Sequence, residues 1–145
     1  MNRLIVPLDV PSAEDAFALV DRLGDQSDFY KVGFELYTRV GPDMVRHLVD
    51  RGKRVFLDIK LHDIPNTVAR AVAVASDLGA ELLTIHASGG PRMMEAAASA
   101  RSGDLKLLAV TVLTSLTPDE MTAVWDREIR SVRDDVGRQI GRAHV

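Results

Sequence analysis

The sequence contains no cysteine, which excludes a disulfide framework, a thiolate metal site and a cysteine nucleophile. No apolar stretch is long enough to span a bilayer, and Asp9, Glu14 and Asp15 interrupt any early run that could act as a signal peptide. The net charge of −3 provides no basic surface for nucleic acid. We therefore expect a soluble, cytoplasmic protein whose partners include neither nucleic acid nor a membrane.

Strands and helices are predicted to alternate along a chain of 145 residues, the size of one ordinary domain. Alternating hydrophobic runs, glycine stops and Ser12 and Thr117 as helix caps locate these elements. Strands are expected at 4–9, 29–34, 55–60, 82–86 and 105–113, and helices at 13–23, 42–50, 66–78, 91–101 and 118–125.

The strand centres recur about every 26 residues, which is the length of a strand-helix unit and predicts an α/β fold with a parallel sheet. Two observations favour a barrel over a doubly wound sheet. The first strand is followed by Asp9-Val10-Pro11-Ser12 and not by a glycine-rich dinucleotide motif. Polar residues also recur at strand C-terminal ends, where a barrel builds its active site. The prediction is a (β/α)8 TIM barrel of which about five of the eight units are present.

The last residues differ from the rest of the chain. From Val136 the apolar periodicity is lost and two glycines follow, so residues 1–136 are expected to form a partial barrel domain and 137–145 a disordered or non-native tail. Ile140 to Val145 can also be encoded by a nucleotide sequence that resembles a sequencing adapter. A barrel of eight units needs more residues than this chain has, so we expect it to be the N-terminal part of a longer protein.

Two carboxylates and a lysine stand at the end of the third predicted strand, in Asp58-Ile59-Lys60-Leu61-His62-Asp63. Strand side chains alternate faces, so Asp58 and Lys60 are expected to point the same way as Phe56. Charges directed into a sheet interior cost free energy unless they are paired or used. The pattern predicts either a structural ion pair or a catalytic site.

Five motifs make this chain resemble the orotidine 5'-monophosphate decarboxylase family over about residues 3–135. They are Leu8-Asp9-Val10, Tyr30-Lys31-Val32-Gly33, Asp58 to Thr67, His86-Ala87-Ser88-Gly89-Gly90 and Val110-Thr111-Val112-Leu113-Thr114-Ser115. The resemblance implies decarboxylation of orotidine 5'-monophosphate (OMP) to UMP and CO2 in pyrimidine biosynthesis, with no cofactor and no metal.

The resemblance also implies residue roles. Lys31, Asp58, Lys60 and Asp63 would form the catalytic charged network, with Lys60 as the proton donor to C6 of the pyrimidine. Asp9 and Lys31 would contact the ribose, and Ser115 the pyrimidine. The family is dimeric, so Asp63 and Thr67 would complete the partner's site across the interface. His86 is expected to be a packing residue.

Two alternatives stay open at this point. One is a magnesium-dependent sugar-phosphate decarboxylase or synthase of the same superfamily, which shares the D-x-K-x-x-D motif. Lys31 argues against it, because those enzymes need a carboxylate at that position. The other is a non-functional truncated fragment, because the glycine and arginine with which the family grips the substrate phosphate belong to later strands. On that ground the 145 residues alone are expected to be inactive.

Overall fold

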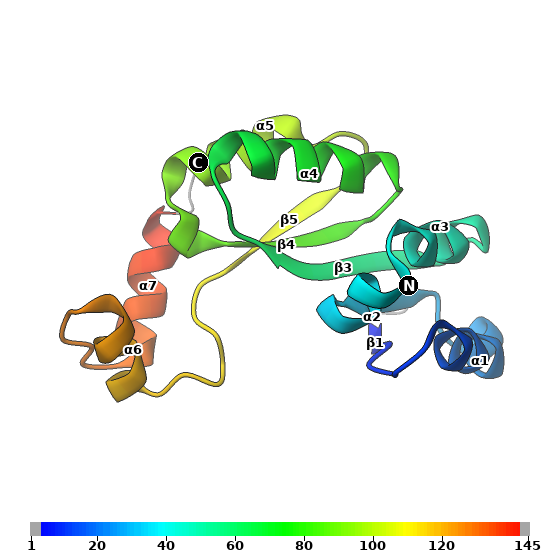
Figure 1. The fold of residues 1–145 in the computed structure, drawn as a ribbon, viewed down its shortest axis with the longest axis horizontal. Coiled ribbons are helices and arrows are strands. Elements are labelled where there is room, and N and C mark those ends of the chain that lie inside the picture. Colours follow the sequence, from blue (N-terminus) through cyan, green and yellow to red (C-terminus); the bar gives the residue numbers. More distant parts are fainter. Residues whose placement is uncertain (1–3, 143–145) are drawn as a thin grey trace.

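The computed structural model describes residues 4–142, which form a five-stranded parallel sheet with helices between the strands (Figure 1). The strands lie side by side in chain order, and each pairs in parallel with the next. They are β1 (Val6–Pro7), β2 (Phe29–Gly33), β3 (Arg54–Leu61), β4 (Leu82–His86) and β5 (Lys106–Val110). The predicted α/β fold with a parallel sheet is confirmed.

The helices follow the strands, and α4 and α5 lie over one face of β3, β4 and β5 (Figure 1). Ser12 and Thr117 cap α1 and α6 as predicted, because each hydroxyl accepts a hydrogen bond from a first-turn amide. The helices are α1 (Ala13–Leu23), α2 (Phe34–Val40), α3 (Pro42–Asp50), α4 (Pro65–Asp77), α5 (Pro91–Ala100), α6 (Pro118–Trp125) and α7 (Val132–Arg142), with short 3-10 turns η1 (Gly24–Gln26) and η2 (Ala87–Gly89).

The main differences from the sequence prediction concern α2, β1 and β5, and the other predicted elements agree to within one residue at each end. Helix α2 was not predicted; it begins at Phe34, which was placed in the preceding strand. Strand β1 is limited to Val6–Pro7, although the Leu8 amide still donates to the Lys31 carbonyl at 2.9 Å. Strand β5 ends at Val110 and a turn follows.

Helix α7 corrects the expected disorder of residues 137–142. The helix continues to Arg142, while residues 143–145 lie outside the described residues. Two of the side chains that α7 buries are polar, Asp135 and Gln139, so no apolar period was readable in this segment. The non-native origin of the last residues stays a prediction.

The hydrophobic core lies between the sheet and the helices packed on it. Tyr30, Val55, Leu57 and Leu83 are fully or almost fully buried strand residues. On β3 the alternate positions Phe56, Asp58 and Lys60 are only partly buried. The sheet therefore has a packed outer face and a second face that carries the charged side chains.

Both edges of the described sheet are open. Within residues 4–142, β1 and β5 each pair with one neighbour, and Leu108 on β5 is 42% exposed. An unpaired strand edge is a template for further strand pairing. Over the same residues, none of the helices has the length and apolar character needed to cross a membrane.

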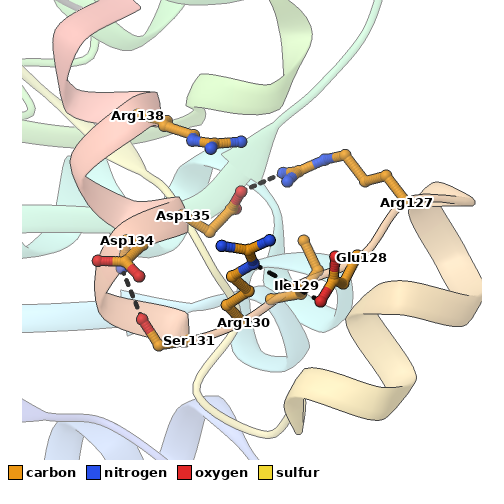
Figure 2. Close-up of a pocket in the computed structure, with 8 residues that line it drawn as sticks. All are labelled: Arg127, Glu128, Ile129, Arg130, Ser131, Asp134, Asp135 and Arg138. Carbon is orange, nitrogen blue, oxygen red and sulfur yellow. Dashed lines mark hydrogen bonds and ion pairs between the residues drawn. The ribbon is translucent and has the colours of Figure 1, made fainter.

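Charged side chains connect the segment that follows α6 to α7 (Figure 2). Asp135 is 2% exposed and accepts hydrogen bonds from Arg127 and Gln139. Burial alone would raise the pKa of Asp135, but these hydrogen bonds hold it below its ordinary value. Three arginines and three carboxylates line a cavity of about 310 Å³ here, Arg127, Arg130, Arg138, Glu128, Asp134 and Asp135, so the cavity carries no excess charge of either sign.

An arginine-carboxylate pair ties β3 to the segment before β4 at the N-terminal end of the sheet. Arg54 donates two hydrogen bonds of 2.6 Å to Glu81, and its guanidinium lies 4.1 Å from the centre of the Phe29 ring. The hydrogen bond from Arg54 lowers the pKa of the Glu81 carboxyl. At this end of a barrel such contacts serve stability.

We predict that Glu81→Gln lowers the free energy of unfolding at pH 7 by about 1 kcal/mol or less, the range for partly exposed ion pairs. The folded-state pKa of Glu81 lies below its ordinary value of 4.5, so the pair stabilises the fold above that pH and the contribution is lost as pH falls through the folded pKa. Urea unfolding at pH 7 and pH 3 measures this. Exposed Glu95→Gln is the matched control, and a Glu81→Gln deficit of equal size at both pH values would contradict the prediction.

Candidate active site

A cavity of about 220 Å³ opens at the C-terminal ends of β1, β2 and β3. Four of the residues predicted from the sequence line it: Asp9, Lys31, Asp58 and Lys60. The other lining residues are Leu8, Val10, Gly33, Phe34, Glu35 and Leu36. Charged and apolar side chains therefore meet at the edge of the sheet where parallel barrels place their chemistry.

The four charged side chains form a chain of alternating sign. Lys31 Nζ lies 2.9 Å from Asp9 Oδ1 and 4.0 Å from Asp58 Oδ2, and Lys60 Nζ lies 2.8 Å from Asp58 Oδ1. Exposure of the side chain falls from 66% at Asp9 to 22% at Lys31 and 17% at Asp58. Each ammonium has a carboxylate neighbour, so opposite charges compensate the partial burial.

A bulge in β3 brings Asp58 and Lys60 to the same cavity. Leu57 pairs with Leu83 and Leu61 pairs with Ile85, so three residues of β3, Asp58 to Lys60, stand opposite the single residue between those two on β4. Lys60 takes a positive φ of 52° at this irregularity. The expected common direction of the two side chains is confirmed by their contact, but a bulge is part of its cause.

Gly33 makes room for the charged chain and was not predicted as a site residue. It pairs with Asp58 across the sheet, and a Cβ at this position would lie 3.3 Å from Lys31 Nζ and 3.4 Å from Asp9 Oδ1. A larger residue would displace the Lys31–Asp9 pair. A glycine inside a predicted strand often marks a close approach of other groups to the backbone, and this is the signal that could have identified it.

Three predicted residues lie outside this cavity. Asp63 is exposed, and its Oδ1 accepts a hydrogen bond of 2.6 Å from the Ile64 amide. Thr67 is exposed in the first turn of α4, and Ser115 is exposed in the turn after β5. The structure therefore brings together Asp9, Lys31, Asp58 and Lys60 and leaves these three apart.

Two histidines pack beside the site. The ring centres of His62 and His86 are 5.2 Å apart. Burial, followed by the charges of His62 and Lys60, lowers the pKa of His86. A neutral imidazole is therefore favoured here, and it adds no positive charge next to the Lys60 ammonium.

The side chains that line the cavity do not have the arrangement of a metal centre. In the part of the chain that the structure describes, no three His, Asp or Glu side chains gather closely enough to hold a metal ion. The Lys31 ammonium stands between Asp9 and Asp58, where a metal would need carboxylate oxygens free.

A comparison with known families identifies the family to which this arrangement belongs. Residues 2–141 match the model of the orotidine 5'-phosphate decarboxylase / HUMPS family. The chain belongs to this family. The resemblance inferred from its motifs is confirmed, and the five described strand-helix units are those of a partial barrel of the TIM-barrel family.

Curated relatives carry the more specific name. The orotidine 5'-phosphate decarboxylase of Rhodopseudomonas palustris (strain HaA2) is 52% identical over 122 residues, which are 83% of this chain and 51% of the relative. That of Caulobacter sp. (strain K31) is 48% identical over 142 residues, 97% of this chain and 60% of the relative. The chain thus spans about half to three fifths of the length of these relatives.

Solved structures support the fold. Orotidine 5'-phosphate decarboxylase from Lactobacillus acidophilus is 34% identical with a TM-score of 0.88, and the match covers 97% of this chain and 66% of that one. The Methanocaldococcus jannaschii orotidine 5'-monophosphate decarboxylase, complexed with the inhibitor BMP, is 26% identical with a TM-score of 0.62. The match covers 69% of this chain and 47% of that one.

Proposed function

We propose that this chain, within a complete barrel, decarboxylates OMP to UMP and CO2 in pyrimidine biosynthesis, without a cofactor and in the cytoplasm. The observation that carries the proposal is the alternating chain Asp9–Lys31–Asp58–Lys60 in the cavity at the strand ends. Curated relatives at about 50% identity bear the name of this activity.

The chemistry accounts for the type of residue in the cavity. When the bond between C6 and the carboxylate breaks, its electron pair stays on C6 in the plane of the ring, where the π system does not delocalise it. Stabilisation must come from fixed charges nearby. The Lys60 ammonium, held by Asp58 at 2.8 Å, is the group that we assign to stabilise this carbanion and then to give C6 a proton.

Repulsion between Asp58 and the substrate carboxylate is a smaller contribution. Two like charges about 4 Å apart repel by about 4 kcal/mol at an effective dielectric constant of 20, which is roughly a thousandfold in rate. Large enzymatic accelerations exceed this by many powers of ten. We therefore assign most of the catalysis to the attraction between Lys60 and the developing carbanion.

The remaining residues receive substrate-binding roles. Asp9 and Lys31, paired at 2.9 Å on the more exposed side of the cavity, would hydrogen-bond the ribose hydroxyls. Ser115 lies in an exposed turn after β5, so it would reach the pyrimidine only when that loop folds over the cavity.

A second subunit would complete the site. Asp63 and Thr67 are exposed near the connection between β3 and α4, and Ile64 between them is 66% exposed. An exposed apolar side chain flanked by polar ones fits a symmetric dimer contact. We propose that Asp63 and Thr67 act in the site of the partner subunit.

Lys60→Ala is predicted to lower kcat at least about a thousandfold, because it removes both the charge opposite the carbanion and the proton donor. The assay uses what we call the barrel-completed chain: residues 1–141 followed by the C-terminal remainder of the Caulobacter relative. Loss of absorbance as OMP becomes UMP measures the rate.

Lys106→Ala is the control, because Lys106 is exposed at the start of β5, where the N-terminal ends of the strands lie. It should leave the rate unchanged. Chelator is also expected to have no effect. An activity lost in chelator and restored by Mg²⁺ would favour the magnesium-dependent alternative. A Lys60→Ala variant with the parent rate would contradict the role assigned to Lys60.

The 145-residue chain alone is predicted to show negligible turnover and to self-associate. Binding of the remote substrate phosphate would offset the cost of forcing a carboxylate into a charged site, and the family's phosphate grip is assigned to later strands. Its open β1 and β5 edges would pair between molecules. Activity and light scattering of the short and barrel-completed chains test this; equal activity would contradict it.

Mixed dimers test the assignment of Asp63. In a dimer of Lys60→Ala with Asp63→Asn, one site receives both changes and the other receives neither if Asp63 acts across the interface. Random mixing of the two inactive variants should then restore about a quarter of the parent activity. No recovery after verified subunit exchange would place Asp63 in its own subunit's site or in neither.

A further inference from the structure

Thr84 is a buried polar residue in the middle of β4, only 3% exposed. It is the residue that stands opposite the bulge, between the Leu57–Leu83 and Leu61–Ile85 pairs. Its hydroxyl is both an acceptor and a donor toward β3. It accepts from the Lys60 amide at 2.9 Å and donates to Asp58 Oδ1 at 3.0 Å. The same hydroxyl is therefore bound to both members of the Lys60–Asp58 pair.

The bulge explains why the Lys60 amide needs this partner. Three residues of β3 share one position on β4, so the regular ladder is interrupted there. A buried amide without a partner is costly, and a positive φ at a lysine persists only where surrounding contacts enforce it. Thr84 replaces the missing ladder acceptor by its side chain.

The second hydrogen bond orients the Asp58 carboxylate. Oδ1 receives both the Thr84 hydroxyl and the Lys60 ammonium, which leaves Oδ2 turned toward Lys31 at 4.0 Å. Rotation of this carboxylate would break both contacts to Oδ1 at once. Thr84 thus binds the backbone amide of Lys60 and also the Asp58 oxygen that the Lys60 ammonium contacts.

We propose that Thr84 is a positioning residue, whose hydroxyl sets the location of the Lys60 ammonium in the cavity by closing a ring through the Lys60 amide and the Asp58 carboxylate. Its catalytic consequence rests on the function proposed above. Misplacement of a catalytic group by about 1 Å can reduce a rate about a hundredfold. Thr84 itself has no contact with the reacting atoms in this proposal.

Thr84→Val keeps the shape of the side chain and removes both hydrogen bonds. In the barrel-completed chain we expect kcat to fall about 10- to 100-fold with KM changed by less than about threefold, because the transition state uses the ammonium position more than substrate binding does. Thr84→Ser, which keeps the hydroxyl, should stay within about threefold of the parent rate.

Ser76→Ala is the matched control for loss of a doubly bonded hydroxyl. Ser76 donates to the Val72 carbonyl at 3.1 Å and accepts from the Ser102 amide at 3.1 Å, away from the cavity. It should destabilise the fold without lowering kcat in the folded protein. A parent rate in Thr84→Val, or a loss that Thr84→Ser does not restore, would overturn the proposal.

Hydrogen exchange at the Lys60 amide gives a readout that does not depend on activity. Thr84→Val should accelerate exchange at this amide at least about tenfold relative to neighbouring amides of β3, and Thr84→Ser should not. If the parent barrel-completed chain does not decarboxylate OMP, the proposed function fails. Hydrogen exchange at the Lys60 amide still tests whether Thr84 forms the hydrogen-bonded ring. Unchanged exchange at Lys60 in Thr84→Val would overturn the ring itself.

Discussion

The contact between the Lys60 ammonium and the Asp58 carboxylate is made where β3 carries a surplus of two residues. Leu57 and Leu61 are four residues apart in β3, but their partners on β4, Leu83 and Ile85, are only two residues apart. The surplus is absorbed as a bulge with Lys60 at φ 52°, a conformation that costs roughly 1–2 kcal/mol for a residue other than glycine. Strain of this kind is tolerated where it directs a functional side chain.

The two ends of the sheet use charge differently. At the N-terminal end, Arg54 and Glu81 form two short parallel hydrogen bonds that satisfy each other. At the C-terminal end, Lys31 reaches Asp58 only at 4.0 Å, and the Lys60 side chain remains 37% exposed. Charges that are held but not fully satisfied by each other remain available to a charged ligand. This division is the one expected of a barrel, with stability at one end and chemistry at the other.

Most of the sheet could be predicted because buried parallel strands have a recognisable sequence pattern, a short apolar run between residues that favour turns. Strand β4 and helices α1 and α6 have the predicted bounds. Helix α2 was missed because the strand signal of Phe29 to Gly33 continues into Phe34, the first residue of the helix, and tertiary packing decided where the strand ends. The helical course of residues 137–142 in α7 was not predicted because the buried positions Asp135 and Gln139 are polar; Asp135 binds Arg127 and Gln139.

The site was predictable in its residues but not in its geometry. Asp9, Lys31, Asp58 and Lys60 stand out in the sequence because charges at strand ends need a reason. Nothing in a two-residue alternation indicates a bulge, so neither the conformation of Lys60 nor the ring through Thr84 could be read from it. Thr84 looks like an ordinary β-branched strand residue, and only the register shows what its hydroxyl faces.

The bulge also explains how a short motif is divided in space. After the irregularity, Leu61 returns to regular pairing with Ile85, and the chain then leaves the sheet before α4 begins at Pro65. Asp58 and Lys60 therefore face the chain's own cavity. Asp63, three residues further on, is exposed and accepts a hydrogen bond from the neighbouring Ile64 amide. A single peptide segment thereby presents one carboxylate, Asp58, to its own ammonium groups and places the second, Asp63, outside the cavity. Lys60 is already paired with Asp58 at 2.8 Å, so this separation leaves Asp63 placed for the role across a subunit interface that we propose above.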